Sequence, residues 1–151
     1  MKNLSPIVLF VYNRPRHTQQ TIEALQKNEL ASESNLIIYS DEAKTENEQE
    51  NVDKVRLYIE QIDTFNKVTI IKREKNWSLA NNIIDGVTKV VNQYEKIIVL
   101  EDDLVTSPYF LKYMNEALDF YKDEEEVMSI TGFSYLQKIP KNYYKDVFIF
   151  Y

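Results

Sequence analysis

The sequence contains no cysteine, one histidine and only two glycines. Without cysteine the chain can form neither a disulfide framework nor a thiolate metal site, which fits a reducing compartment. Two glycines cannot build a Gly-rich phosphate loop of the P-loop or dinucleotide-binding kind. A Ser-His-Asp triad would have to use His17, and no nucleophile motif accompanies it. We therefore interpret His17 as a surface residue of the first helix.

The sequence also lacks a long apolar run and an excess of basic residues. No apolar stretch approaches the roughly 20 residues that a helix needs to span a bilayer. The 151 residues carry a formal net charge of −6, which argues against nucleic acid as a partner because phosphate backbones bind basic surfaces. An acidic protein can still bind a nucleotide diphosphate if a metal ion or a few cations act as intermediary. At this length we expect one domain, or a large piece of one.

Apolar runs alternate with amphipathic stretches along the chain. Strands are predicted at Pro6–Tyr12, Leu36–Tyr39, Val68–Ile71, Ile97–Leu100 and Val127–Thr131. Helices are predicted at Thr18–Asn28, at Glu46–Ile62, from a cap at Ser78 to about Tyr94, and after a cap at Ser107-Pro108. This order implies an α/β fold with a mostly parallel, Rossmann-like sheet and helices on both faces. In such a sheet the ligand lies outside the carboxyl ends of the strands.

The chain ends in the apolar run Val147–Tyr151, which predicts a strand with no partner after it. A domain rarely stops at such a point, so we expect a domain truncated at its C-terminus. Tyr143, Tyr144 and Tyr151 also lie in this part of the chain. They either stack on a sugar or pack against the protein, and the sequence favours neither.

Three consecutive carboxylates, Glu101, Asp102 and Asp103, directly follow the fourth predicted strand. We expect this strand to be buried and central in the sheet. Adjacent carboxylates repel one another unless a cation or water lies among them, and oxygen-only ligands suit Mg²⁺ or Mn²⁺. The alternative is a solvated acidic turn that starts the next helix. The position at the carboxyl end of a strand favours a site for a metal–nucleotide complex.

Other polar residues follow the remaining strands. Asp41 can accept a hydrogen bond from a base N–H or a ribose hydroxyl, or it can simply form a turn. Arg14 and Arg73 can each supply a cation for a phosphate or a base contact, although loop arginines are mostly exposed. The segment Asn76–Asn81 places amides and a tryptophan beside a helix start, where packing and capping are the alternative role.

Four segments, in this order, resemble the nucleotide-sugar-binding half of GT-A glycosyltransferases: PIVLFVYNRP, SDE, REKNWSLANNI and IIVLEDDLVTSPYFLKYM. The resemblance covers Pro6 to Phe133. It is nearest to family-2-type bacterial sugar transferases and to the N-acetylglucosaminyltransferase I branch, in which the usual D-x-D motif appears as E-D-D. The strongest element is the strand followed by EDDL and then by S-P-x-F-x-x-Y.

This resemblance implies a role for each candidate residue. Asp103 would ligate a divalent metal, Mn²⁺ or Mg²⁺, that bridges the diphosphate of the donor. Glu101 and Asp102 would contact the ribose or the donor sugar. The other implied donor-binding residues are Val11, Tyr12, Asn13 and Arg14 for the nucleoside pocket, Asp41 for the base, and Arg73, Asn76 and Asn81 for the base, ribose or sugar.

The implied reaction is attack of an acceptor hydroxyl on the anomeric carbon of a nucleotide-sugar donor, with inversion. In the family the catalytic base comes from a later segment, so we assign no catalytic residue within 1–151. We expect residues 1–151 to be the nucleotide-sugar-binding domain, without the acceptor and base part, and to have little or no activity alone. The resemblance further implies a glycan or glycolipid acceptor, bacterial surface polysaccharide or glycoconjugate synthesis, and a cytoplasmic location with peripheral association at the inner face of the membrane.

Three other functions fit parts of the pattern. A receiver-like signalling domain needs an acidic pair after the first strand, where this chain has Asn13-Arg14. A nucleotidyltransferase needs a Gly-rich basic loop at the same place. A non-catalytic sugar-nucleotide-binding module remains open, because half of a transferase would be nearly that. The sequence favours no oligomeric state.

Overall fold

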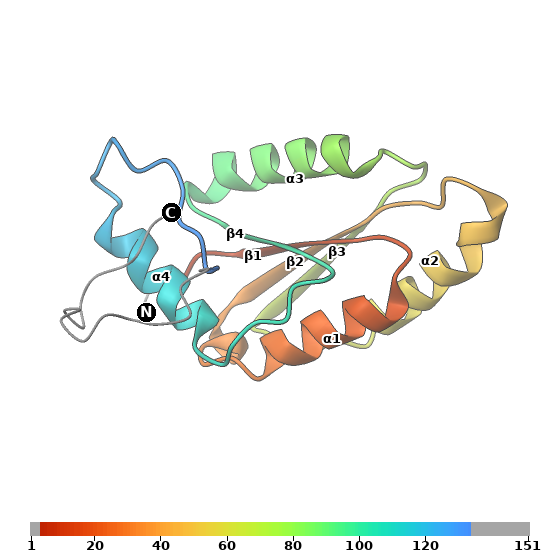
Figure 1. Cartoon of the computed structure of the whole chain (residues 1–151), viewed down its shortest axis with the longest axis horizontal. Coiled ribbons are helices and arrows are strands. Elements are labelled where there is room, and N and C mark those ends of the chain that lie inside the picture. Colours follow the sequence, from red (N-terminus) through yellow and green to blue (C-terminus); the bar gives the residue numbers. More distant parts are fainter. Residues whose placement is uncertain (1–3, 134–151) are drawn as a thin grey trace.

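The computed structural model describes residues 4–133, which form a single sheet flanked by helices (Figure 1). No helix in this part of the chain is long and apolar enough to cross a membrane. The elements in order are β1 (Ile7–Val11), α1 (Pro15–Gln26), the short 3-10 helix η1 (Ala31–Glu33), β2 (Asn35–Ser40), α2 (Glu46–Ile59), β3 (Lys67–Lys72), α3 (Leu79–Tyr94), β4 (Ile98–Glu101) and α4 (Phe110–Phe120).

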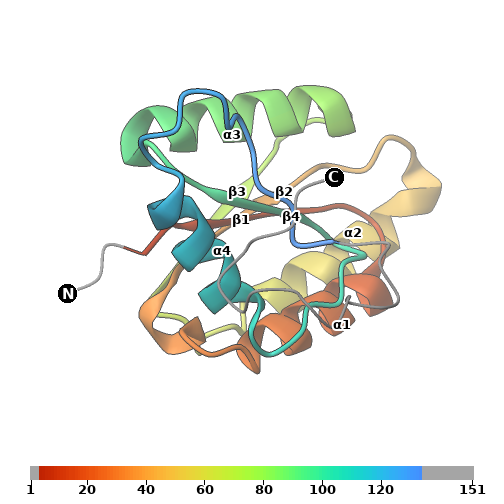
Figure 2. The ribbon, with the colours of Figure 1, turned by 60° about the vertical axis from the view of Figure 1, so that its left-hand side comes forward.

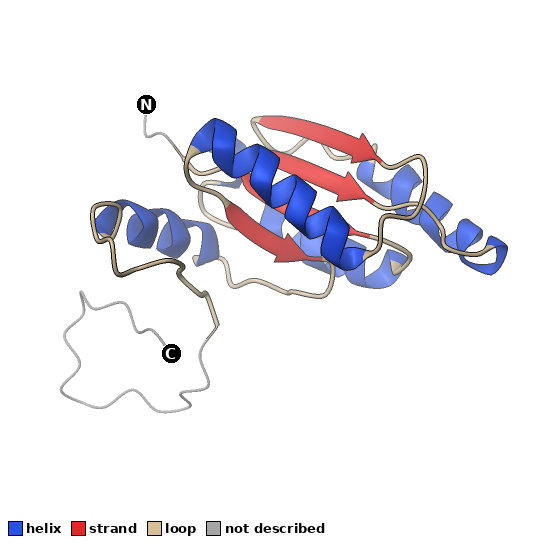
Figure 3. Cartoon of the chain, turned by 90° about the horizontal axis from the view of Figure 1, so that it is seen from above, coloured by secondary structure: helices blue, strands red, loops and turns tan. Residues whose placement is uncertain are grey.

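The four strands form an all-parallel sheet in the order β3-β2-β1-β4. Figure 3 shows the arrows of the sheet pointing the same way beneath α3. Helix α3 covers one face of the sheet and α1 and α2 cover the other, in both Figure 1 and Figure 2. This arrangement confirms the predicted α/β class with helices on both faces.

The residues of β1 explain why its apolar run is continuous. Successive side chains of a strand point to opposite faces, and both faces of β1 are covered by helices. Ile7, Leu9 and Val11 belong to the larger apolar cluster on the α1–α2 side. Val8 and Phe10 belong to the smaller cluster under α3. All five residues of β1 are buried.

One of the two glycines lets α3 approach the sheet closely. A Cβ atom on Gly86 would lie 2.8 Å from the Phe10 ring and 3.0 Å from the Tyr39 ring. These two rings are stacked with their centroids 5.4 Å apart, and both lie against the helix at Gly86. Glycine at this position therefore brings α3, and the loop before it, against the ends of β1 and β2.

Two predictions about the strands were wrong. No strand forms at Val127–Thr131, where Met128 is 97% exposed and most neighbouring residues are exposed as well. Strand β4 lies at an edge of the described sheet instead of at its centre, and its Val99 is 40% exposed. The order of the strands depends on the crossovers between them, which apolar content does not determine.

The starts of α1 and α4 differ from the prediction, whereas the start of α3 agrees with it. Helix α1 begins at Pro15, three residues before the predicted start, with proline in its first turn. Helix α4 begins at Phe110, and the predicted cap Ser107 instead lies before the helix and accepts the Phe110 N–H at 3.1 Å through its carbonyl. Ser78 is the N-cap of α3 as predicted, but its side chain makes no capping bond. His17 lies exposed on α1, as expected.

The apolar run Val147–Tyr151 and the tyrosines at 143 and 144 lie outside the described residues.

Candidate functional site

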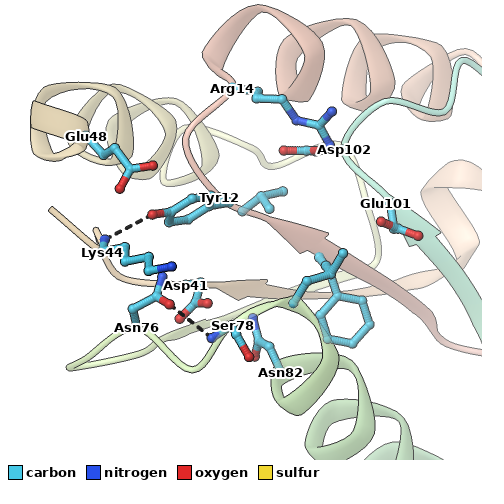
Figure 4. A pocket seen from close by; sticks show the side chains of 13 residues that line it. Tyr12, Arg14, Asp41, Lys44, Glu48, Asn76, Ser78, Asn82, Glu101 and Asp102 are labelled. Carbon is cyan, nitrogen blue, oxygen red and sulfur yellow. Dashed lines mark hydrogen bonds and ion pairs between the residues drawn. The ribbon is translucent and has the colours of Figure 1, made fainter.

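A cavity of about 330 Å³ opens at the carboxyl ends of β1, β2 and β4 (Figure 4). Parallel strands bring their carboxyl ends to the same edge of the sheet, which is where such folds bind ligands. Its lining residues are Phe10, Val11, Tyr12, Arg14, Asp41, Lys44, Glu48, Asn76, Ser78, Leu79, Asn82, Glu101 and Asp102.

The cavity brings together most of the residues singled out in the sequence. Those that line it are Val11, Tyr12, Arg14, Asp41, Asn76, Glu101 and Asp102. Those that lie beside it without lining it are Asn13, Arg73, Asn81 and Asp103.

The acidic corner of the cavity is held by Arg14. Its guanidinium donates to the Asp102 carboxylate, and its Nη1 lies 3.0 Å from Oδ2 of Asp103. Asp102 is 3% exposed, whereas the Arg14 side chain is 43% exposed. Within the described structure, Oδ2 of Asp102 is buried without a hydrogen-bond partner.

The electrostatics of this corner follow from that geometry. Burial raises the pKa of the Asp102 carboxyl above its ordinary value, and the hydrogen bond and charge of Arg14, together with a hydrogen bond from the Tyr12 backbone, offset this only in part. Burial acts to lower the pKa of Arg14, but the bonds and charges of Asp102 and Asp103 raise it overall. The corner thus combines a cation with a buried carboxylate whose charge these bonds stabilise only in part.

On the opposite wall, Glu48 ties the start of α2 to the end of β1. Glu48 completes a capping box with Thr45, whose N–H donates to Oε2 of Glu48 at 3.2 Å. Its other oxygen accepts the side-chain amide of Asn13 at 2.8 Å. Asn13 is therefore directed to Glu48 and not to the cavity. The Tyr12 hydroxyl accepts the Lys44 backbone N–H at 3.0 Å (Figure 4).

Asp41 links β2 to the loop that precedes α3. Its Oδ1 accepts the backbone N–H groups of Trp77 at 2.9 Å and of Glu42 at 3.0 Å. The amide nitrogen of Asn76 donates to the Glu42 carbonyl at 2.6 Å, and the amide oxygen of Asn76 accepts the Ser78 N–H at 3.1 Å. Asp41 is buried. These hydrogen bonds hold the Asp41 carboxylate in place in the cavity wall.

Arg73 lies behind this wall and not in it. Its guanidinium donates to Asn82 Oδ1 at 2.9 Å and to Asp85 Oδ2 at 2.6 Å, and it is 8% exposed. It also stacks over the Trp77 ring, 4.0 Å from the centroid, and over Tyr39 at 5.0 Å. Because Asn82 lines the cavity, Arg73 acts through Asn82. Asn81 is exposed, and its amide lies 3.4 Å from the Ser78 hydroxyl.

Sequence reasoning missed several lining residues. A signal was present for Glu48, because the string Thr45-x-x-Glu48 before an amphipathic stretch is a capping-box pattern. Asn82 lies in the first turn of α3, one turn after the predicted cap. Ser78 and Leu79 belong to the predicted segment Asn76–Asn81, and the remaining missed residues are Phe10 and Lys44.

The acidic corner fits a divalent ion of the magnesium kind. The described residues include no cluster of three or more acidic or histidine side chains arranged as metal ligands. Such an ion needs only one or two carboxylates, however, and takes its other oxygens from water and phosphate. The unpartnered Oδ2 of Asp102 and the half-exposed Asp103 carboxylate would supply oxygen ligands to such an ion. The guanidinium between them shows that the two carboxylates can share one cation.

Comparison with known proteins agrees with the predicted resemblance. A family model described as glycosyl transferase family 2 matches residues 7–143, whereas none of the curated proteins matches the sequence. Two crystal structures of S. aureus TarS are similar in fold. One has a TM-score of 0.53 and 16% identity over 79% of this chain, and the other, of TarS 1-349, has 0.54 and 13% over the same share. This chain covers 20% and 33% of those chains, respectively.

Proposed function

The chain belongs to glycosyl transferase family 2, and we propose that residues 1–151 form the part of such an enzyme that binds the nucleotide-sugar donor. The observation that supports this assignment is the single cavity that gathers the acidic end of β4, Asp41 and the loop before α3. The reaction we propose is transfer of a sugar from a nucleotide-diphosphate donor to an acceptor hydroxyl, with inversion.

The nucleoside lies, in this proposal, between Tyr12 and the loop that carries Asn76. Asp41 offers a carboxylate oxygen to a base N–H or a ribose hydroxyl, because only its Oδ1 is used by the backbone bonds of Trp77 and Glu42. Val11 lines this proposed subsite, Asn13 supports it by donating to Glu48, and Asn81 lies beside it. Arg73 contributes by holding Asn82 in the cavity wall.

The diphosphate lies at the acidic corner. Asp103, together with Oδ2 of Asp102, would hold Mn²⁺ or Mg²⁺, and the ion would stabilise the negative charge that develops on the departing nucleotide diphosphate. Arg14 and Lys44 both line the cavity. They supply the positive charge that an acidic chain needs beside phosphates. Glu101, also in the lining, faces the region left for the donor sugar.

We assign no catalytic base to the described residues. An inverting transfer requires a group that accepts the proton of the attacking hydroxyl, and we propose that a later segment of the protein supplies it. The proposed acceptor is a glycan or a glycolipid of bacterial surface polysaccharide synthesis. The proposed location is the cytoplasm, with peripheral association at the inner face of the membrane.

Thermal denaturation with UDP- and GDP-sugars, with and without Mn²⁺, tests the donor site. A nucleotide sugar at 100 times its Kd stabilises a protein by about 2.7 kcal/mol. We expect at least one of them to raise the Tm by a few degrees only when Mn²⁺ is present. Asp103→Ala should abolish the metal-dependent part of this increase. Asp63→Ala is the matched control, because Asp63 is exposed in the loop before β3, at the opposite end of the sheet.

Two results would contradict the proposal. One is the absence of metal-dependent stabilisation by every nucleotide sugar. The other is a response of Asp103→Ala equal to that of the unsubstituted chain.

A further inference from the structure

A second cavity, of about 710 Å³, lies on the outer side of the loop that precedes α3. Lys75, Asn76 and Trp77 line it from this loop, and one face of α3 lines it from Asn81 to Lys89. The α3 residues recur at helical spacing, so they form a continuous stripe on the helix surface. We call this cavity the α3 groove. Asn76 is the one described residue that lines both the α3 groove and the donor cavity.

Trp77, the only tryptophan of the chain, is held rigidly in the α3 groove. The Arg73 guanidinium stacks on its ring at 4.0 Å from the centroid, and Asp41 accepts its backbone N–H at 2.9 Å. Arg73 is fixed in turn by Asn82 and Asp85. The folded protein thus orients the aromatic ring before any ligand arrives, which lowers the entropic cost of binding.

Three polar side chains of the α3 groove, those of Asn81, Thr88 and Lys89, are exposed. The Asn81 amide makes one long contact of 3.4 Å with Ser78, and Thr88 presents an exposed hydroxyl. Lys89 pairs with Asp85 at 2.9 Å and is otherwise exposed. Amides and hydroxyls both donate and accept hydrogen bonds. They are therefore suited to a ligand that carries many hydroxyl groups.

The composition of the α3 groove favours a saccharide over other ligands. A sugar ring has an apolar face that packs on an aromatic ring and hydroxyls around its edge, which matches an oriented tryptophan flanked by amides. A peptide helix would need several apolar anchors, whereas Ile84 is the main exposed aliphatic side chain here. A nucleic acid is a poor candidate ligand, because its phosphates would be repelled by a chain with a net charge of −6.

We propose that the α3 groove binds a saccharide with Trp77 as its stacking surface. Resting on the proposed function, we further propose that this saccharide is a segment of the acceptor glycan. The shared wall at Asn76 supports the assignment, because a glycan lying in the α3 groove would extend along the 75–77 loop toward the donor cavity.

The fluorescence of Trp77 provides a direct test, because the chain has no other tryptophan. The probes are four tetrasaccharides: chitotetraose, maltotetraose, mannotetraose and tetragalacturonic acid. We expect at least one to change the emission of Trp77 saturably. Asn81→Ala and Thr88→Ala should each weaken that binding about fivefold, the value of one hydrogen bond. Asn92→Ala, exposed on α3 outside the groove lining, should bind like the unsubstituted chain.

Each outcome separates the α3 groove from the donor cavity when nucleotide binding is measured on the same samples. If no tetrasaccharide changes the emission, or if Asn81→Ala and Thr88→Ala both bind as tightly as the control, the saccharide site is overturned. If a saccharide binds but no nucleotide sugar stabilises the chain with Mn²⁺, the saccharide site stands and its assignment to a glycosyl acceptor falls. Both substituted residues are exposed, so neither variant should perturb folding.

Discussion

Arginines lie on both sides of the donor cavity, but their surroundings differ. At the ends of β2 and β3, Arg56 donates to the Glu42 carboxylate at 2.8 Å and to the Arg73 carbonyl at 2.9 Å. Arg73 is itself buried and bonded to side chains of α3. At the ends of β1 and β4, the Arg14 side chain is 43% exposed, and its guanidinium donates to the acidic pair Asp102 and Asp103.

The carboxylates on the two sides differ in the same way. Hydrogen bonds from Lys89 and Arg73 lower the pKa of Asp85. Burial acts to raise the pKa of Glu42, but hydrogen bonds from the Ala43 N–H and the Gln49 and Arg56 side chains lower it overall. Burial raises the pKa of Asp102, and the hydrogen bonds from Arg14 and the Tyr12 backbone lower it by less than burial raises it. The fold therefore stabilises the charged forms of Asp85 and Glu42 on one side of the cavity, whereas it destabilises the charged form of Asp102 on the other side.

This difference separates a framework from a binding site. Polar groups that bond one another fully contribute to stability and fix the geometry of the wall. A buried carboxylate oxygen without a donor is unfavourable in the free protein, and a cation supplied with the ligand can relieve it. Such concentrations of unfavourable charge are typical of functional sites.

The largest effect is expected for Arg73→Ala. The substitution leaves the buried Asn82 without its donor, removes one cation from Asp85, and exposes the faces of Trp77 and Tyr39. We expect the free energy of unfolding to fall by about 2–4 kcal/mol in urea denaturation. Arg16→Ala on the exposed side of α1 is the control and should change it by less than about 0.5 kcal/mol. A loss for Arg73→Ala as small as the control would contradict the framework role.

The next effect concerns acid stability. The folded pKa of Asp85 is lowered below its unfolded value, so its contribution is present above about pH 4 and is lost as the pH falls through the folded pKa. We expect Asp85→Asn to reduce stability at pH 7 by about 1.5 kcal/mol, the low end of the range for a hydrogen bond to a charged group, because the Asp85 side chain is partly exposed. Once the pH is below the folded pKa of Asp85, the two proteins should converge. Urea denaturation across this range measures the difference, and a constant difference at every pH would contradict the lowered pKa.

The sequence predicted the positions of the strands along the chain better than their order in the sheet. Four strands were predicted because their apolar runs are strong local signals, and each lies within two residues of its observed place. The start of α4 could not be predicted, because Asn28 fixes it from a distance. Its amide oxygen accepts the Leu111 N–H at 2.9 Å, and its amide nitrogen donates to Thr106 at 3.0 Å. Local capping patterns contain no information about such contacts.

The sequence predicted which loops form the candidate site, but it did not predict which partners the side chains of these loops contact. Strand ends in an α/β order identify which loops meet, which is why Arg14, Asp41 and Asp102 were found. The direction of each side chain depends on partners elsewhere in the fold. Arg73 follows a strand end as expected, yet Asn82 and Asp85 on α3 turn it away from the cavity.

On the other side of the cavity, Asp102→Asn should have a smaller effect of opposite sign. The folded pKa of Asp102 is raised, so its charged form costs stability at neutral pH, and this cost disappears as the pH falls to the unfolded value near 4. The neutral amide should therefore increase the free energy of unfolding at pH 7, by less than about 1 kcal/mol. The same variant should lose the Mn²⁺-dependent stabilisation by nucleotide sugars. A loss of stability beyond about 1 kcal/mol at pH 7 would place Asp102 with the framework.

The smallest effect on stability is expected for Arg14→Gln. Arg14 and Asp103 are both about half exposed, so water screens their pairing, and exposed ion pairs are worth about 0–1 kcal/mol. Glutamine can still donate one hydrogen bond to Asp102. We expect the free energy of unfolding to change by about 0.5 kcal/mol or less in the urea experiment used for Arg73→Ala. Mn²⁺ alone, followed by electron paramagnetic resonance, should bind Arg14→Gln more tightly than the unsubstituted chain, because no guanidinium competes for the two carboxylates. If Arg14→Gln instead destabilised the chain as much as Arg73→Ala, the two sides would be equivalent parts of one framework. The unpartnered oxygen of Asp102 would then no longer indicate where the ligand binds.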